Sequence, residues 1–209
     1  MNRYSFLDLA TSASVRSAQA EMGVDHLWTP GRVDRQSEAF TPNEEAFIAA
    51  RDSFYMASVS ETGWPYVQYR GGPAGFLKVI DERTLAFADF RGNRQYISVG
   101  NLDVNDRVAL ILVDYPRRAR LKILAHVQRL ALDAEPGLLE RVSDPAYRAK
   151  PERIFRLRLA AFDWNCPQHI VPRFTEGEIS QAVQPLHQKL QALEAENRAL
   201  RERLGESKP

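Results

Sequence analysis

Two short stretches carry residue types that could bind a flat, anionic molecule. In Gln68–Pro73 (Gln-Tyr-Arg-Gly-Gly-Pro), a β-prone run reaches a glycine-rich break. Glycine lets a backbone lie close to a ligand and offer its N–H groups, although a bulge at a barrel corner would use the same residues. The second stretch, Phe87–Gln95, turns at Gly92 and is expected to begin a helix near Asn93. Free N–H groups at a helix start, with an Asn cap and Arg94 beside them, would seat a phosphate.

A third stretch concentrates positive charge. Arg117–Lys122 contains four cations in six residues. On a strand, Arg118, Arg120 and Lys122 would share one face and could complement an anionic ligand. A hairpin whose cations are simply solvated explains the same sequence. Together the three stretches favour a β-barrel that holds an anionic, planar molecule.

The sequence lacks the common catalytic and metal-binding motifs. It contains no GxSxG, HExxH, Walker A or GxGxxG motif. Its four histidines do not have the spacing of metal ligands, and its one cysteine, Cys166, cannot build a zinc site. We therefore expect no metal. A single cysteine also forms no intrachain disulfide, which favours a reducing compartment.

Composition narrows the choice of partner. In 209 residues, 28 Lys and Arg balance 27 Asp and Glu, so a net charge of +1 gives no general attraction to nucleic acid or anionic membrane. No apolar run has the length of a membrane-spanning helix, and the N-terminus lacks the apolar core of a signal peptide. These features predict a cytoplasmic protein whose ligand is a small molecule.

The hydrophobic pattern divides the chain into three parts. Residues 1–52 are helical and irregular and are expected to pack on the domain that follows. Thr41-Pro42-Asn43-Glu44 is a strong helix start, with a Thr cap, Pro at the first helical position and acid in the first turn. Phe47, Ile48 and Ala50 of that helix are expected to face inward. A shorter amphipathic stretch runs from Ser12 to Met22.

Residues 53–174 change to a period of two. Strands are expected at 54–59, 66–70, 76–80, 85–90, 108–113, 121–132 and 154–164, and helices at 93–103 and 136–142. Strands joined mostly by turns predict a mainly β fold with flanking helices, an antiparallel barrel rather than a doubly wound sheet.

Residues 175–209 form a helical tail with a heptad repeat. Two sets of residues recur every seven positions: Ile179, Leu186, Leu193 and Leu200 (d), and Val183, Leu190, Asn197 and Leu204 (a). One Asn at an a position is typical of a parallel two-stranded coiled coil, and the pairs Lys189–Glu194 and Glu196–Arg201 would attract across it. A long amphipathic helix packed on its own domain is the alternative. We expect the continuous helix to begin at Pro185.

A basic-zipper DNA-binding protein is excluded by the residues before this repeat. Such a protein needs a continuous basic helix there. Here the stretch contains three prolines and two acids, with Arg173 as its only Lys or Arg.

Residues 45–173 resemble the pyridoxamine 5′-phosphate oxidase-like flavoproteins. The likeness rests on the order and spacing of four segments, which are Leu77-Lys78 before Asp81-Glu82, the Phe87–Arg94 junction, Asn105–Leu110 and Arg120–Leu130. The resemblance implies an FMN-binding split β-barrel, a two-fold homodimer with flavin sites at the subunit interface, and an FMN-dependent oxidoreductase. By position it implies as cofactor-binding residues Gln68, Tyr69, Arg70, Gly71, Ala88, Asp89, Asn93, Arg94, Gln95 and Arg120. Of the family's Ser/Arg/Lys trio at the phosphate, only the Arg is kept, as Arg94.

The substrate side departs from the true oxidases. Their C-terminal Arg-Leu-His-Asp-Arg motif is replaced by Asn165–Arg173, so the resemblance implies an oxidase-related protein of undefined substrate. The substrate-side candidates are Lys78, Asn165, Gln168 and Arg173. His169 is the candidate proton donor, because imidazole exchanges protons near neutral pH, although a surface or interface role explains it equally. The alternative function is a non-catalytic carrier or sensor that holds flavin, haem or a deazaflavin.

Overall fold

The computed structural model describes residues 6–27, 39–165 and 167–205 of the chain. They belong to two compact units. One contains the sheet and extends to Gln168, apart from Tyr115–Arg117. The other consists of Tyr115–Arg117 and the chain from His169 onward. Each unit is described by itself below.

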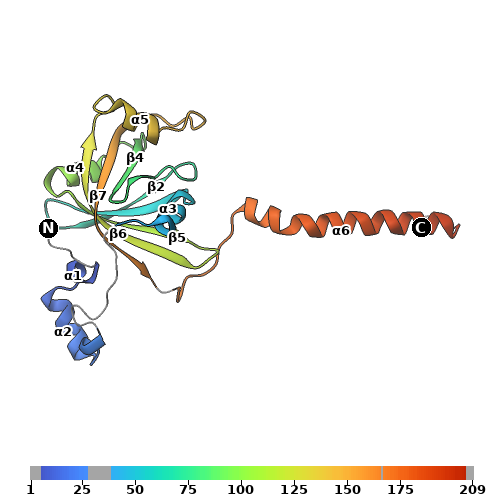
Figure 1. The fold of residues 1–209 in the computed structure, drawn as a ribbon, viewed down its shortest axis with the longest axis horizontal. Coiled ribbons are helices and arrows are strands. Elements are labelled where there is room, and N and C mark those ends of the chain that lie inside the picture. The colour runs from blue at the N-terminus through green and yellow to red at the C-terminus, as the bar shows by residue number, and fades with distance from the viewer. Residues whose placement is uncertain (1–5, 28–38, 166, 206–209) are drawn as a thin grey trace. The chain divides into compact units, whose positions relative to one another are not determined.

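Seven strands form one antiparallel sheet in the first unit (Figure 1). In chain order they are β1 Ser53–Val59, β2 Pro65–Gly71, β3 Lys78–Asp81, β4 Thr84–Phe90, β5 Arg107–Asp114, β6 Ala119–Leu130 and β7 Pro151–Asn165. Across the sheet the order is β2-β1-β5-β6-β7-β4-β3, and every neighbouring pair is antiparallel. The predicted mainly β, antiparallel class is confirmed.

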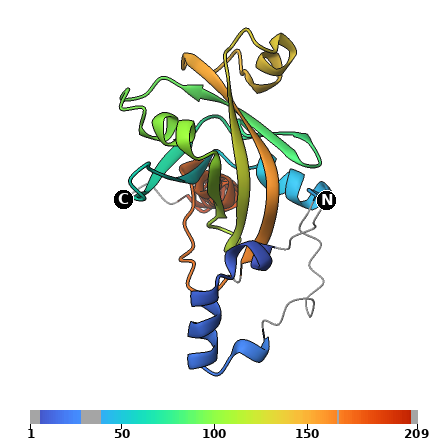
Figure 2. The same cartoon turned by 90° about the vertical axis from the view of Figure 1, so that its left-hand side faces the viewer.

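The two longest strands, β6 and β7, belong to both halves of the sheet (Figure 2). The first part of β6 pairs with β5, while its length from Arg120 to Leu130 pairs with β7. On the other side of β7, its first part pairs with β4. A register shift between Leu124 and Ala125 interrupts the β6–β7 ladder, and such shifts bend a strand pair. The result is the split β-barrel that the resemblance implies.

Aromatic side chains fill the interior. Burial alternates along β1, which places Phe54 and Met56 inside. The ring of Phe87 lies 5.3 Å from that of Phe54 and 5.3 Å from that of Phe155, centroid to centroid. A smaller cluster under α5 (Pro136–Val142) includes Leu138. Burial of these large side chains supplies the main driving force for folding of the barrel.

Helix α3 (Pro42–Ala49) begins where the sequence predicts. The Thr41 side chain and the buried Glu44 carboxylate form a capping box. Glu44 Oε1 also accepts a 2.6 Å hydrogen bond from Trp164 Nε1, which ties the helix to β7. Burial raises the pKa of Glu44, but hydrogen bonds from Thr41 and Trp164 outweigh it and hold the pKa below its ordinary value. Ile48 is fully buried as predicted, whereas Ala50 is exposed, which corrects that part of the prediction.

Two other helices differ from their predicted starts. Helix α4 spans Ile97–Val104 and begins four residues later than expected, because Arg94 and Tyr96 have positive φ angles of 63° and 52° and form an irregular loop. Helix α6 spans Glu176–Arg203 with Pro185 inside it, so the prediction that the helix begins at Pro185 is wrong. Thr175 and Glu178 form the capping box that starts it.

The remaining elements lie outside the barrel. The N-terminal part has α1 (Phe6–Ala10), α2 (Ala13–Glu21) and the 3₁₀ turn η1 (Asp25–Leu27). Lys122 Nζ lies 4.6 Å from the ring centroid of Phe6, which brings α1 against the sheet.

Arg118 has φ 54° in the turn before β6, so it does not share a strand face with Arg120 and Lys122 as predicted. Among the described residues, no helix could cross a membrane, and none of their side chains cluster as a metal site would require.

Candidate cofactor-binding site

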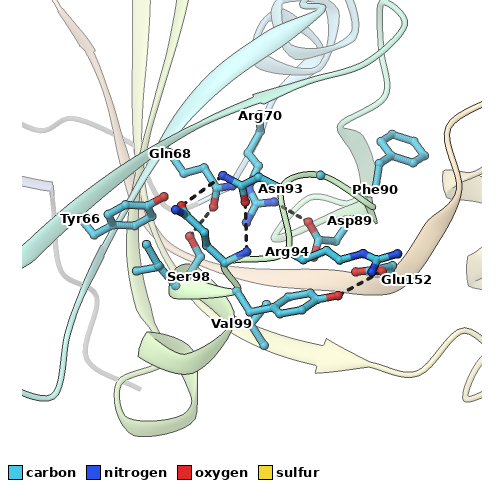
Figure 3. A pocket seen from close by; sticks show the side chains of 14 residues that line it. Tyr66, Gln68, Arg70, Asp89, Phe90, Asn93, Arg94, Ser98, Val99 and Glu152 are labelled. Carbon is cyan, nitrogen blue, oxygen red and sulfur yellow. Dashed lines mark hydrogen bonds and ion pairs between the residues drawn. The ribbon is translucent and has the colours of Figure 1, made fainter.

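One open pocket gathers side chains from five places in the chain (Figure 3). Its volume is about 400 Å³, including the solvent space at its mouth. It lies between β2, the end of β4, the loop before α4, the start of α4 and the start of β7. Its lining residues are Tyr66, Gln68, Arg70, Asp89, Phe90, Gly92, Asn93, Arg94, Gln95, Tyr96, Ile97, Ser98, Val99 and Glu152. Six of the ten predicted cofactor-binding residues therefore line one pocket.

Strand β2 contributes every second residue to the pocket. Tyr66, Gln68 and Arg70 share one face because a strand alternates. Gln68 Oε1 accepts a 2.7 Å hydrogen bond from the buried Ser98 hydroxyl, which holds the start of α4 against β2. The strand thus fixes three polar side chains along one wall.

A buried ion cluster forms the floor. Arg70 Nη1 makes an ion pair with Asp89 Oδ1, and Arg153 Nη1 lies 3.4 Å from Asp89 Oδ2. Burial raises the pKa of Asp89 above its ordinary value, although both arginines pull it down. Burial likewise lowers the pKa of Arg70. The guanidinium of Arg70 lies 5.5 Å from the ring centroid of Phe155, so this cation is held between an acid and an aromatic face.

The cluster has buried donors that its acids do not satisfy. Asp89 is shared by two arginines and Arg153 also pairs with Glu152 at 3.1 Å, yet the buried Arg70 Nε has no hydrogen-bond partner among the described residues. The same holds for Arg153 Nη1. A buried donor without an acceptor is costly. An anionic or carbonyl-bearing ligand near this floor would relieve that cost.

The loop before α4 is built by a local turn. Asn93 Oδ1 accepts a 3.1 Å hydrogen bond from Gln95 N, so Asn93 closes an Asx turn and is not the predicted helix cap. The cap position is Tyr96, whose side chain makes no capping bond. The first N–H groups of α4 therefore lie beside the pocket without acceptors in the helix. The N–H groups at the helix start, which the sequence placed near Asn93, are those of Ile97–Val99.

Arg94 is the free cation of this loop. It lines the pocket and makes no hydrogen bond or ion pair within the described part of the chain. Its neighbour Arg91 instead donates a 2.9 Å hydrogen bond from Nε to Glu152 Oε1. That bond lowers the pKa of Glu152, which also accepts from Tyr96 Oη at 3.3 Å. Glu152 thus anchors the loop, while Arg94 has no partner among the described residues.

Four predicted cofactor-binding residues do not line this pocket. Tyr69 lies on the opposite face of β2, where it packs edge-on against Tyr55 at 5.6 Å. Gly71 leaves room for that ring, because a Cβ there would lie 2.9 Å from the Tyr69 side chain. Ala88 is buried in the cluster under α5. Arg120 pairs in register with Asn165, and its buried Nε has no described partner. Their contact with a flavin stays a prediction.

The substrate-side candidates are dispersed. Lys78 starts β3 and does not line the pocket. Gln168 is exposed, and the side chain of Asn165 and all of Cys166 lie outside the described residues. His169, with φ 63°, and Arg173 belong to the second unit, where the Arg173 guanidinium lies 5.0 Å from the ring centroid of Tyr115. Their role at the substrate stays a prediction.

Sequence reasoning missed the residues that support the site. Tyr66 and Ser98 could have been found from the period of β2 and the first turn of the helix. Glu152 and Arg153 carry no local signal, because they reach the pocket from β7 through the β4–β7 pairing, where Arg153 is opposite Asp89.

Fold and site together define a split-barrel protein with a pocket lined by arginine and other polar side chains. The Pyridoxamine 5′-phosphate oxidase family model matches residues 40–162. The chain therefore belongs to the pyridoxamine 5′-phosphate oxidase family. No curated protein matches the chain.

Several solved structures are similar in fold. HupZ of Group A Streptococcus has 12% sequence identity and a TM-score of 0.49, over 65% of this chain and 99% of that one. A putative pyridoxamine 5′-phosphate oxidase from Lactobacillus delbrueckii has 19% identity and a TM-score of 0.46, over 61% and 96%. An FMN-binding protein from Syntrophomonas wolfei has 16% identity and a TM-score of 0.42, over 73% and 95%.

Proposed function

We propose that the protein binds FMN in the pocket of Figure 3 and is an FMN-dependent oxidoreductase acting on a small molecule. The observation that carries the proposal is the unpaired Arg94 beside the free N–H groups of α4, with the orphaned Arg70 Nε on the floor. A phosphate needs charge-assisted donors, and a flavin ring carries carbonyl acceptors. The donor set fits both ends of such a ligand.

In this proposal the different sides of the pocket bind different parts of FMN. Arg94 and the backbone of Ile97–Val99 would hold the phosphate, and Gln68 and Arg70 would line the ring. Bound FMN would supply the redox chemistry, accepting two electrons from a donor and passing them on. Arg70, which lines the pocket, and Arg153 behind it, both paired with Asp89, would keep positive charge near the ring and would stabilise negative charge on a reduced flavin.

His169 is proposed as the proton donor, on sequence grounds. His169→Gln should lower turnover while leaving the flavin content unchanged. Loss of flavin with the same substitution would make His169 a structural residue instead.

We propose a homodimer in which the partner completes the flavin site. One chain offers an open wall rather than an enclosed cavity, and a ligand the size of FMN is normally buried over most of its surface. An apolar strip on the outer face of β1 and β2 supports this, because Tyr55, Val67 and Tyr69 are each at least 40% exposed. We also propose a cytoplasmic location, because a single cysteine favours a reducing compartment.

The test is the absorbance spectrum of the purified full-length protein, with mass spectrometry of the released cofactor. FMN absorbance that bleaches with NAD(P)H or dithionite and recovers in air supports a redox flavoprotein. Flavin that dithionite alone reduces, with no turnover of any donor, would favour a carrier or sensor. A haem or deazaflavin spectrum would replace FMN, and a colourless protein that binds no added FMN would overturn the proposal.

A further inference from the structure

The outer surface of α6 presents an apolar stripe that nothing in the described structure covers. No residue of this helix is buried. The stripe residues Ile179, Leu186, Leu190, Leu193, Leu200 and Leu204 are between 46% and 73% exposed. The helix and the sheet belong to different compact units. A continuous apolar stripe of this length on a solvated helix needs a partner.

The helix is longer than the sequence alone suggested. Because it continues through Pro185, seven of the eight a and d positions, from Ile179 to Leu200, lie on one helix, and the eighth, Leu204, is its C-cap. Pro185 is at position c, on the outer side, where its ring and the lost N–H do not touch the stripe. At about 1.5 Å per residue, the 28 residues extend for about 42 Å, enough for nearly four heptads.

We infer that the stripe binds α6 of a second copy of this chain, as a parallel two-stranded coiled coil. In that arrangement a g residue meets the e residue five positions later on the partner. Lys189 then faces Glu194, and Glu196 faces Arg201, so both interchain pairs are attractive. All four side chains are on exposed positions of the helix.

Asn197 selects the parallel orientation. In a parallel pair each Asn197 lies opposite its own mate, and the two amides bond each other. In an antiparallel pair a positions pack against d positions, and full overlap of the two stripes puts Asn197 against Leu186. The amide would then be buried without a partner, which disfavours the antiparallel pair. The same chain-to-chain pairing holds whether or not FMN binds, so this inference goes beyond the proposed function.

The test is disulfide trapping in the full-length chain with Cys166→Ala as background. Leu200→Cys is at a d position, where a parallel coil brings the two copies of residue 200 face to face. Arg198→Cys, two residues away on the outer side, is the matched control. In a glutathione redox buffer, Leu200→Cys should become mostly covalent dimer, and Arg198→Cys should stay at least tenfold less cross-linked.

Mixing the Val183→Cys and Leu200→Cys variants tests for the antiparallel orientation, because residues 183 and 200 of two chains face each other only in the antiparallel overlap. Cross-linking confined to that mixture would overturn the inference. So would equal cross-linking of Leu200→Cys and Arg198→Cys, or none with either. Arg198 and Leu200 are exposed and Val183 is half-buried, and circular dichroism of each variant under reducing conditions checks that the fold is kept.

Discussion

The pocket and the α6 stripe differ in how far apart in the sequence their residues lie. In the pocket, Arg70 meets Asp89 across 19 positions of sequence, and Tyr96 meets Glu152 across 56. Arg70 and Asp89 are largely buried, and each is held by a partner from another element, whereas Arg94 is exposed and has no described partner. Along α6 the pattern is local. The a and d residues each recur every seven positions, and no residue of the helix is buried. A site assembled by the fold should therefore be sensitive to single buried changes, whereas a repeated stripe should tolerate them.

The largest expected effect comes from removing the acid at the floor of the pocket. Asp89→Asn leaves the buried Arg70 without its anion and leaves Arg153 with Glu152 alone, which should destabilise the barrel by about 3–5 kcal/mol. Chemical denaturation measures it. Asp103→Asn is the control, because Asp103 pairs with Arg129 at the surface and should cost about 1 kcal/mol or less. Equal losses of unfolding free energy for the two variants would show that the buried ion cluster stabilises the fold no more than a surface ion pair does.

Removing the free cation should affect the ligand more than the fold. Arg94→Ala should weaken FMN binding by about 1.5–3 kcal/mol, the range for a hydrogen bond to a charged group. Titration of apoprotein by fluorescence measures it, with riboflavin as the ligand that lacks the phosphate. Arg107→Ala, an exposed cation outside the pocket, should change neither affinity. If FMN and riboflavin weaken equally, Arg94 does not bind the phosphate.

Glu44 gives a smaller effect that depends on pH. Glu44→Gln weakens the capping box and the Trp164 bond and should cost about 1–2 kcal/mol at neutral pH. The folded pKa lies below the ordinary value of 4.5, so the stabilisation is present above that pH and is lost as pH falls through the folded pKa. Unfolding curves of the two proteins should converge in acid. A difference in unfolding free energy that stays the same in acid would contradict this pH dependence.

Truncation after Thr175 should affect the barrel little. The shortened chain should keep its flavin and remain a dimer of lower stability, because the proposed barrel interface is the larger one. Sedimentation and absorbance measure both properties. A flavin-free monomer would mean that the tail carries the assembly.

The smallest effect is expected at the single cysteine. Cys166→Ala should leave flavin content and turnover unchanged, since the sequence around it shows no base or cation that would activate a thiolate except His169. Loss of turnover with intact flavin content would give the cysteine a chemical role.

Local signals in the sequence predicted local structure well. Thr41 and Pro42 start α3 as expected, and α5 occupies the predicted residues 136–142. The heptads fall on one helix, which continues through Pro185 and does not begin there.

The errors concern places where tertiary contacts decide. Asn93 has the residue type of a helix cap, yet its side chain bonds Gln95 N and the helix starts at Ile97. Tyr69 is adjacent to two pocket residues in sequence but lies on the other face of an edge strand. Glu152 and Arg153 could not be foreseen, because only the pairing of β4 with β7 brings them to Asp89.

The left-handed backbone at Arg94 and Tyr96 has a consequence for how this loop can change over time. Each residue holds a conformation that costs a side chain other than glycine about 1–3 kcal/mol. Glycine at position 94 would remove the backbone strain of the loop, but it would also remove the cation. Selection for thermal stability and selection for affinity toward the proposed ligand would therefore act in opposite directions at this position. The loop of a heat-adapted relative would then be expected to recover its rigidity elsewhere, through the bonds that Arg91 and Tyr96 make to Glu152.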